Sequence, residues 1–261
     1  MNEQEILALY DRELRIDIEY PGMRKEASAD IVRFFRPAPG MSFVRYSCLT
    51  AGNADERIAE QVERFASWDG PCSWDLFSHD QPADLLERLA AHDFEPEEEP
   101  GAVMVLDMAD TPEMLFSATG AGVRRIERRE QLAEVIPVLE AVWGDSFAWV
   151  DERLGENLLI PGYLSVYVAE VDDRPAACAW IYFYPGSHFA GLYGGATLPE
   201  FRDRGLYSAL LAARARDARQ RGYRFLTIDA GSMSRPIAAR RGFRQITTVT
   251  TCTWKGKSSV K

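Results

Sequence analysis

The C-terminal half of the chain alternates between short apolar runs and stretches in which apolar residues recur every three or four positions. The short runs predict strands at residues 123–128, 164–171, 176–184, 188–198 and 225–228. The helical spacing predicts helices at residues 131–143, 146–159, 203–221 and 234–241. This alternation predicts an α/β domain built on a mixed sheet.

The N-terminal half repeats part of this series. Its pattern predicts a first helix at 1–20, strands at 30–36, 42–49, 73–77 and 103–108, and further helices at 55–68 and 82–92. Asp93-Phe94 follows the last of these helices, as Gly242-Phe243 follows the last helix of the chain. The order indicates a degenerate, partial copy of the C-terminal fold; an unrelated α/β domain with the same alternation is the alternative.

A connecting segment separates the two halves. Residues 109–122 end in Thr119-Gly120-Ala121-Gly122, a combination typical of a flexible link. We therefore expect one domain at residues 1–118 and a second at residues 119–261.

Composition narrows the class of protein. The chain has 261 residues, of which 46% are hydrophobic and 27% charged, and this suits a soluble globular protein of one or two domains. No apolar run approaches the roughly 20 residues that span a bilayer, and the acidic N-terminus does not resemble a secretory signal. The four cysteines are isolated, and the three histidines show no ligand spacing. The sequence therefore predicts a cytoplasmic protein with no metal site and no membrane association.

Charge is distributed unevenly along the chain. Residues 1–110 contain 10 basic and 24 acidic side chains, whereas residues 111–261 contain 20 basic and 16 acidic ones. The basic half suits a polyanionic ligand. Nucleic acid is not expected, because the whole chain is acidic and the arginines of helix 203–221 have no interleaved aromatic residues. The helical pattern places Arg214, Arg216 and Arg219 on the solvent side of that helix.

The most informative local pattern is the turn before this helix. An apolar run ends at Leu198, and Arg202-Asp203-Arg204-Gly205 leads directly into the helical spacing. A helix start carries N–H groups without intrahelical acceptors, and glycine allows an anion to approach the backbone closely. Arg202 and Arg204 add positive charge. The turn therefore predicts a phosphate site, with an ordinary turn and two solvated arginines as the alternative.

The run Arg202-Asp203-Arg204-Gly205-Leu206-Tyr207 resembles the acyl-CoA pyrophosphate turn of the GNAT superfamily of N-acetyltransferases, Arg/Gln-x-x-Gly-x-Gly/Ala. Tyr207 replaces the final small residue of that signature. Residues 234–243 resemble the family's last helix, which ends Tyr-x-x-x-Gly-Phe, and the resemblance spans about residues 123–254. It implies a GNAT acyl-CoA N-acyltransferase fold at 119–261, preceded by a smaller, degenerate GNAT-like half domain.

The resemblance also implies a co-substrate and its contacts. Acetyl-CoA is the expected acyl donor, bound by the turn. The backbone of Ala196 and Leu198 faces its pantetheine arm, and Ser234 is a further contact. The acceptor implied is a primary amine of a small molecule or peptide, and neither its identity nor the oligomeric state follows from the sequence.

One position departs from the family pattern. Ala238 stands where many members carry the tyrosine that protonates the departing thiolate. The candidates for proton transfer near the cleft are Asp229, Tyr193, Tyr182 and Glu170, and predicted strand position favours Asp229 and Tyr193. A catalytically degenerate acyl-CoA-binding module remains an alternative, as does an acyltransferase that uses aminoacyl-tRNA.

Overall fold

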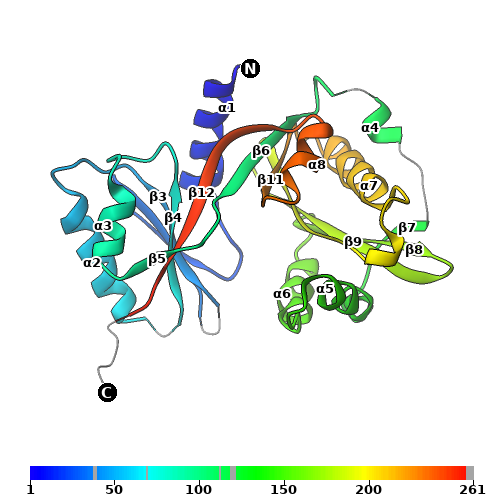
Figure 1. Cartoon of the computed structure of the whole chain (residues 1–261), viewed down its shortest axis with the longest axis horizontal. Helices are drawn as coiled ribbons and strands as arrows, with labels where there is room; N and C mark the ends of the chain where they lie inside the picture. The colour runs from blue at the N-terminus through cyan, green and yellow to red at the C-terminus, as the bar shows by residue number, and fades with distance from the viewer. Residues whose placement is uncertain (38–39, 69, 112, 118–121, 257–261) are drawn as a thin grey trace. The chain divides into compact units, whose positions relative to one another are not determined.

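The computed structural model describes residues 1–37, 40–68, 70–111, 113–117 and 122–256. The chain forms two compact units (Figure 1). The first unit contains residues 1–104, 229–240 and 244–261, and the second contains residues 105–228 and 241–243. Strand β6 (Gly101–Asp107) and strand β11 (Phe225–Ala230) each begin in one unit and end in the other.

The first unit is a sheet with helices. Its strands follow the order β1-β2-β3-β4-β12, with β5 paired to β12. They are β1 (Arg24–Ala27), β2 (Ile31–Phe35), β3 (Ser42–Ser47), β4 (Cys72–Phe77), β5 (Phe94–Pro96) and β12 (Arg244–Trp254). The helices are α1 (Glu3–Tyr10), which continues as a π-helical segment Asp11–Ile16, then α2 (Ala54–Ala66), α3 (Leu85–Ala91) and α8 (Arg235–Arg240).

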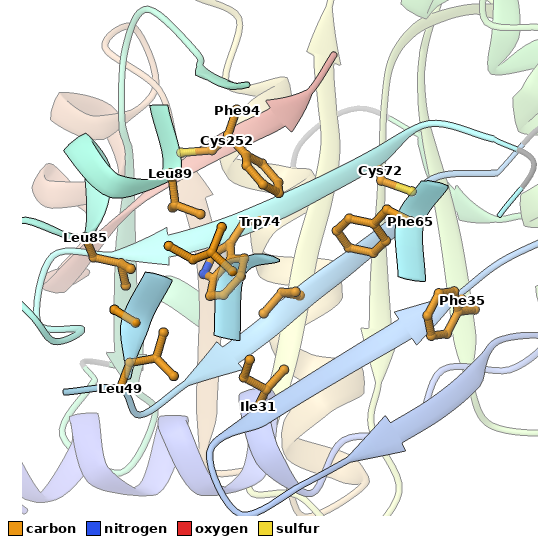
Figure 2. Packing of buried hydrophobic residues seen from close by; sticks show 13 residues of the cluster. Ile31, Phe35, Leu49, Phe65, Cys72, Trp74, Leu85, Leu89, Phe94 and Cys252 are labelled. Carbon is orange, nitrogen blue, oxygen red and sulfur yellow. The ribbon is translucent and has the colours of Figure 1, made fainter. Parts of the chain in front are cut away.

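The core of this unit lies between its sheet and helices α2 and α3. Trp74 on β4 is fully buried, and Phe65 of α2 and Leu89 of α3 pack into the same cluster (Figure 2). Helix α2 contributes Ile58 and Phe65, which are seven residues apart and so lie on one helix face. Burial of this apolar face is what holds the short helices against the sheet.

The second unit contains the other half of the fold. Its strands follow the order β11-β10-β9-β8-β7. They are β7 (Gly122–Arg125), β8 (Leu164–Val171), β9 (Arg174–Phe183), β10 (Phe189–Thr197) and the first residues of β11. The helices are α4 (Met114–Ser117), the 3-10 turns Arg129–Glu134 and Pro199–Phe201, α5 (Ile136–Trp143), α6 (Trp149–Leu158) and α7 (Leu206–Gln220).

Helices cover both faces of the sheet in the second unit. Helices α5 and α6 lie on one side of β8 and β9, and α7 lies on the other (Figure 1). Val166, Val168 and Trp180 pack toward α5 and α6. Helix α7 buries a face rich in alanine and leucine, which lets it approach the strands closely.

The two units repeat one order of elements. In the first, parallel strands β3 and β4 are joined by α2, and a short helix, α3, follows. In the second, parallel strands β10 and β11 are joined by α7, and the short helix α8, which belongs to the first unit, follows β11 along the chain. The repeat expected from the N-terminal pattern is therefore present in the order of the elements.

The compact units do not coincide with the continuous segments 1–118 and 119–261. Residues 229–240 and 244–261 belong to the first unit although they come last in the sequence. Of the expected link at 109–122, residues 112 and 118–121 lie outside the described residues. Strand β12 was not predicted, because its threonines give it no apolar run. Their β-branched side chains were the available signal. The predicted helix 1–20 was too long, since it ends at Ile16.

Asp217 on α7 ties this helix to the sheet of the second unit. It accepts hydrogen bonds from Tyr167 Oη at 2.8 Å and Arg221 Nε at 2.7 Å. Burial opposes its charge, but hydrogen bonds from Arg221, Ser165 and Tyr167 lower its pKa below the usual value. The carboxylate therefore stabilises the fold above about pH 4, the unfolded pKa, and this contribution is lost as the pH falls through the folded pKa.

We expect Asp217→Asn to lower the free energy of unfolding by about 2 kcal/mol at pH 7, because charged hydrogen bonds are lost. The difference from wild type should narrow from about pH 4 downward, as the pH approaches the lowered folded pKa at which the wild-type carboxylate also becomes neutral. Urea unfolding at pH 7, 4 and 3 measures this. A difference that stays constant over that range would show that ionised Asp217 contributes nothing.

Candidate functional site

The turn between β10 and α7 has the backbone of an anion site. Gly205 precedes the helix with φ of 79°, in the left-handed region, and a Cβ there would meet no atom within 4 Å. The first helical hydrogen bond runs from Ala209 N–H to Gly205 O at 3.0 Å. The N–H groups of the preceding residues, Leu206 to Ser208, therefore have no acceptor within the helix. No acidic residue lies in this first turn.

Positive side chains surround this helix start. Arg202 makes only a long contact, from Nε to Thr197 O at 3.5 Å, and Arg204 lies over the Phe201 ring at 5.2 Å. Both are exposed, and neither forms an ion pair with any described residue. Arg241 donates from Nη2 to Ser208 Oγ in the first turn of α7. Arg241 was not predicted as a site residue, although the run Arg240-Arg241 before Gly242 was a signal.

Strand β10, which leads into this turn, pairs with β11 only along its first residues. It pairs with β11 from Phe189 to Gly191, and the described residues show no β10–β11 pair after Gly191–Thr227. On its other edge, β10 pairs with β9 through a bulge between Tyr193 and Ala196. The last residues of β10, just before the turn, therefore have an edge facing β11 with which an extended ligand can pair.

Glycine at the bulge is required by a close contact. A Cβ on Gly194 would lie 1.7 Å from the Trp180 ring, and its φ is 61°. Among the two predicted pantetheine contacts, Ala196 lies just past the bulge and is buried. Leu198 uses both backbone groups within the protein: its N–H donates to Ala176 O at 3.0 Å, and its C=O accepts from Phe201 N at 2.9 Å.

Tyr193 lies in a cluster of tyrosines on β9 and β10. Its hydroxyl is 3.1 Å from that of Tyr184, and its ring is 5.5 Å from that of Tyr182. The side chains of Tyr184 and Tyr193 both lie close to Gly191. A Cβ on this glycine would come within 2.7 Å of the Tyr184 hydroxyl and within 2.7 Å of the Tyr193 ring. Tyr193 is 39% exposed. The structure therefore places a partly exposed phenol on β10, close to the point where the pairing with β11 ends.

Asp229 and Ser234 belong to the first unit. Although the Asp229 side chain reaches solvent, desolvation by the surrounding protein raises its pKa; Asp75 and Glu97 add to this, and Arg45 opposes it. Ser234 Oγ donates to Gly231 O at 3.3 Å, within the turn that opens α8. Ala238 is fully buried, so this position presents no polar group to a ligand.

The equivalent helix of the first unit has the opposite electrostatics. The first turn of α2 carries Asp55 and Glu56, and Asn53 accepts from Thr50 N–H at 2.7 Å just before it. Negative charge at a helix N-terminus opposes phosphate binding there. The favourable turn is therefore the one that opens α7.

The residues that the structure describes contain neither a metal-ligating cluster nor a helix that could cross a membrane. No group of three or more His, Cys, Asp or Glu side chains could hold a metal ion. No helix has the length and apolar character needed to cross a bilayer.

Comparison with known proteins gives a consistent result. Residues 128–243 match the model of the acetyltransferase (GNAT) family. No curated protein matches the chain. A GCN5-related N-acetyltransferase from Kribbella flavida is similar in structure, with a TM-score of 0.70, 15% identity, and coverage of 98% of this chain and 96% of that one.

Two other solved structures share the fold. A functionally unknown conserved protein from Staphylococcus epidermidis has a TM-score of 0.68 at 16% identity, covering 94% of this chain and 97% of its own. A tandem GNAT protein from the clavulanic acid biosynthesis pathway has a TM-score of 0.58 at 14% identity, with coverage of 91% of this chain and 85% of that one. The chain thus shares the GNAT fold in a two-part arrangement, and its residues 128–243 match the acetyltransferase (GNAT) family model.

Proposed function

We propose that the chain is an acetyl-CoA-dependent N-acetyltransferase that transfers an acetyl group directly to a primary amine of a small molecule or peptide. The observation that carries this proposal is the start of α7, where N–H groups without helical acceptors lie beside Arg202 and Arg204, two arginines that form no ion pair with a described residue. The cysteines of the chain are free thiols, and this fits a protein of the reducing cytoplasm.

The turn supplies a site for the diphosphate of CoA. Phosphate oxygens accept from the N–H groups of Leu206 and its neighbours, while the two arginines neutralise the charge. From there the pantetheine arm extends along β10 toward the bulge, where the β11-facing edge is unpaired. Ala196 is the backbone position that supports this route. Leu198 supports it less, because its N–H and C=O are already bonded.

The reaction is an aminolysis of a thioester. The neutral amine nitrogen forms a bond to the acetyl carbon, the carbon–sulfur bond breaks with its electron pair on sulfur, and the amine gives up a proton. Amines have a free pKa near about 10, so a base must accept a proton at neutral pH. Backbone N–H groups at the bulge are suited to stabilise the oxyanion.

Asp229 and Tyr193 are the residues we propose for proton transfer. A raised pKa makes the Asp229 carboxylate a better base near neutral pH. The Tyr193 residue is 39% exposed, and the hydroxyl of Tyr184 lies 3.1 Å from its own hydroxyl. Tyr193 provides a phenol, whereas Ala238, at the position of the family's usual tyrosine, provides none.

We expect Asp229→Asn and Tyr193→Phe each to lower kcat/KM by about 10²- to 10⁴-fold, because each removes an acid–base group. Acetyl-CoA binding should stay unchanged. Steady-state release of free CoA thiol measures turnover, and Asp172→Asn, in an exposed hairpin turn, is the matched control. Unchanged turnover in either variant would remove that residue from the mechanism.

A second candidate is an acyl-CoA-binding module without transfer activity. Full burial of Ala238 favours it, because no acid occupies the usual position. Acetyl-CoA binding without release of CoA over a broad panel of amines would support the module and exclude the enzyme.

A further inference from the structure

Arg214, in the middle of α7, is a buried cation with no counterion among the residues that the structure describes. Its side chain is only 3% exposed, so its predicted place on the solvent side of the helix was wrong. Nη1 donates to Trp180 O at 3.3 Å, and Nε donates to Leu210 O at 3.2 Å. Within the described ranges, no carboxylate lies at ion-pair distance. The other buried arginines differ, because Arg15 pairs with Asp80 and Arg33 with Glu26.

The surroundings of Arg214 provide no negative charge. The titratable groups that face it are Tyr207 on its own helix, Cys178 on β9 and Tyr167 on β8. Burial raises the pKa of Cys178 to about 12, so this thiol is neutral at physiological pH. Burial lowers the pKa of Arg214 to about 10, which leaves the guanidinium charged. An unpaired buried charge is costly, and an anion brought close to it would offset that cost.

The position of Arg214 indicates where that anion forms. Trp180, whose carbonyl accepts from Arg214, pairs with Tyr193, the last pair before the bulge in β10. The Trp180 ring also covers Gly194, inside the bulge. The guanidinium is therefore held against the strand that borders the bulge. Under the proposed function, the acyl end of the pantetheine arm reaches this point.

We propose that Arg214 stabilises the CoA thiolate as it leaves, through its charge and without donating a proton, in place of the tyrosine that Ala238 replaces. This inference rests on the proposed function. As the nitrogen–carbon bond forms and the carbon–sulfur bond breaks, the electron pair stays on sulfur. The amine proton passes to the base or to water, and Arg214 keeps all its protons. The thiolate takes a proton from solvent after it leaves the site.

Ionisation of the bound thiol tests this role directly. We would titrate CoA bound to the full chain and follow thiolate absorbance in the ultraviolet, for wild type, Arg214→Met and Arg214→Lys. Wild type and Arg214→Lys should bind the thiolate form at least about tenfold more tightly than the thiol, because a nearby charge acts strongly in a buried site. Arg214→Met should lose this preference. A purely structural role would not change it.

Two controls separate the possible failures. Desulfo-CoA, which has no thiol, should bind wild type and Arg214→Met equally. Arg216→Met, on the same helix but half-buried and bonded to Phe116 O, should behave as wild type. Equal thiol ionisation in wild-type-bound and free CoA would overturn the role of Arg214 even if Arg214→Met fails to fold. Failure of both CoA and desulfo-CoA to bind wild type would instead overturn the proposed function.

Discussion

Acetyl-CoA should raise the melting temperature of the wild-type protein and leave that of Gly205→Glu unchanged. A ligand that binds only the folded state must stabilise it. The Gly205 position is open, so a glutamate side chain fits sterically, but it brings a negative charge to the diphosphate site. Two like charges near 4–5 Å at the surface cost about 3–4 kcal/mol, which weakens binding by roughly 100-fold or more.

Gly222 offers a matched control at the other end of α7. It also has a left-handed φ, of 83°, and open space around its Cβ position. Gly222→Glu therefore carries a similar backbone strain and the same charge, about 15 residues away from the turn. We expect it to keep the full stabilisation by acetyl-CoA. An equal loss in both variants would mean that the effect of Gly205→Glu comes from strain or net charge.

The largest effect on stability is expected for Asp80→Ala in the first unit. Arg15 is fully buried, donates to both Asp80 oxygens at 2.8 and 2.9 Å, and lies over the Phe77 ring at 3.8 Å. Removal of Asp80 leaves its guanidinium partly unpaired and also frees the Phe77 N–H that Asp80 accepts. Loss of one partner of a buried ion pair costs about 3–5 kcal/mol.

Chemical unfolding of the full chain measures this cost. Asp84→Ala is the control, because the ion pair of Asp84 with Arg88 is exposed and should contribute less than about 1 kcal/mol. The double variant Arg15→Met/Asp80→Leu should recover much of the loss, since no charge is left buried without its partner. A cost for Asp80→Ala as small as that for Asp84→Ala would show that Arg15 finds other compensation, such as Asp11.

The cofactor turn could be predicted because its determinants are local. The left-handed residue and the helix start depend on Gly205 and its sequence neighbours, and the structure has both. Most elements of both halves also follow from short-range periodicity. Strand β12 and the discontinuous units depend on pairing between residues far apart in the chain, for example Val249 with Phe77, which periodicity does not encode.

The interior of the site was harder to predict for the same reason. Arg214 and Arg216 are two residues apart on one helix with similar sequence surroundings, yet Arg214 is buried and Arg216 is not. Residues two apart on a helix point to nearly opposite sides, and here the side of Arg214 faces the sheet, where its guanidinium contacts Trp180 O. The hydroxyl contact between Tyr184 and Tyr193 likewise depends on Gly191, which lies between them in sequence but matters through its missing Cβ.

The most direct test of a single acyl-CoA site at the start of α7 is the stoichiometry of acetyl-CoA binding at equilibrium. Equilibrium dialysis of the full chain with labelled acetyl-CoA should give one bound molecule per chain, because α7 begins with free N–H groups and arginines whereas α2 begins with Asp55 and Glu56. Two bound molecules per chain would contradict the assignment to one helix start. No binding at saturating acetyl-CoA would contradict the proposed function itself.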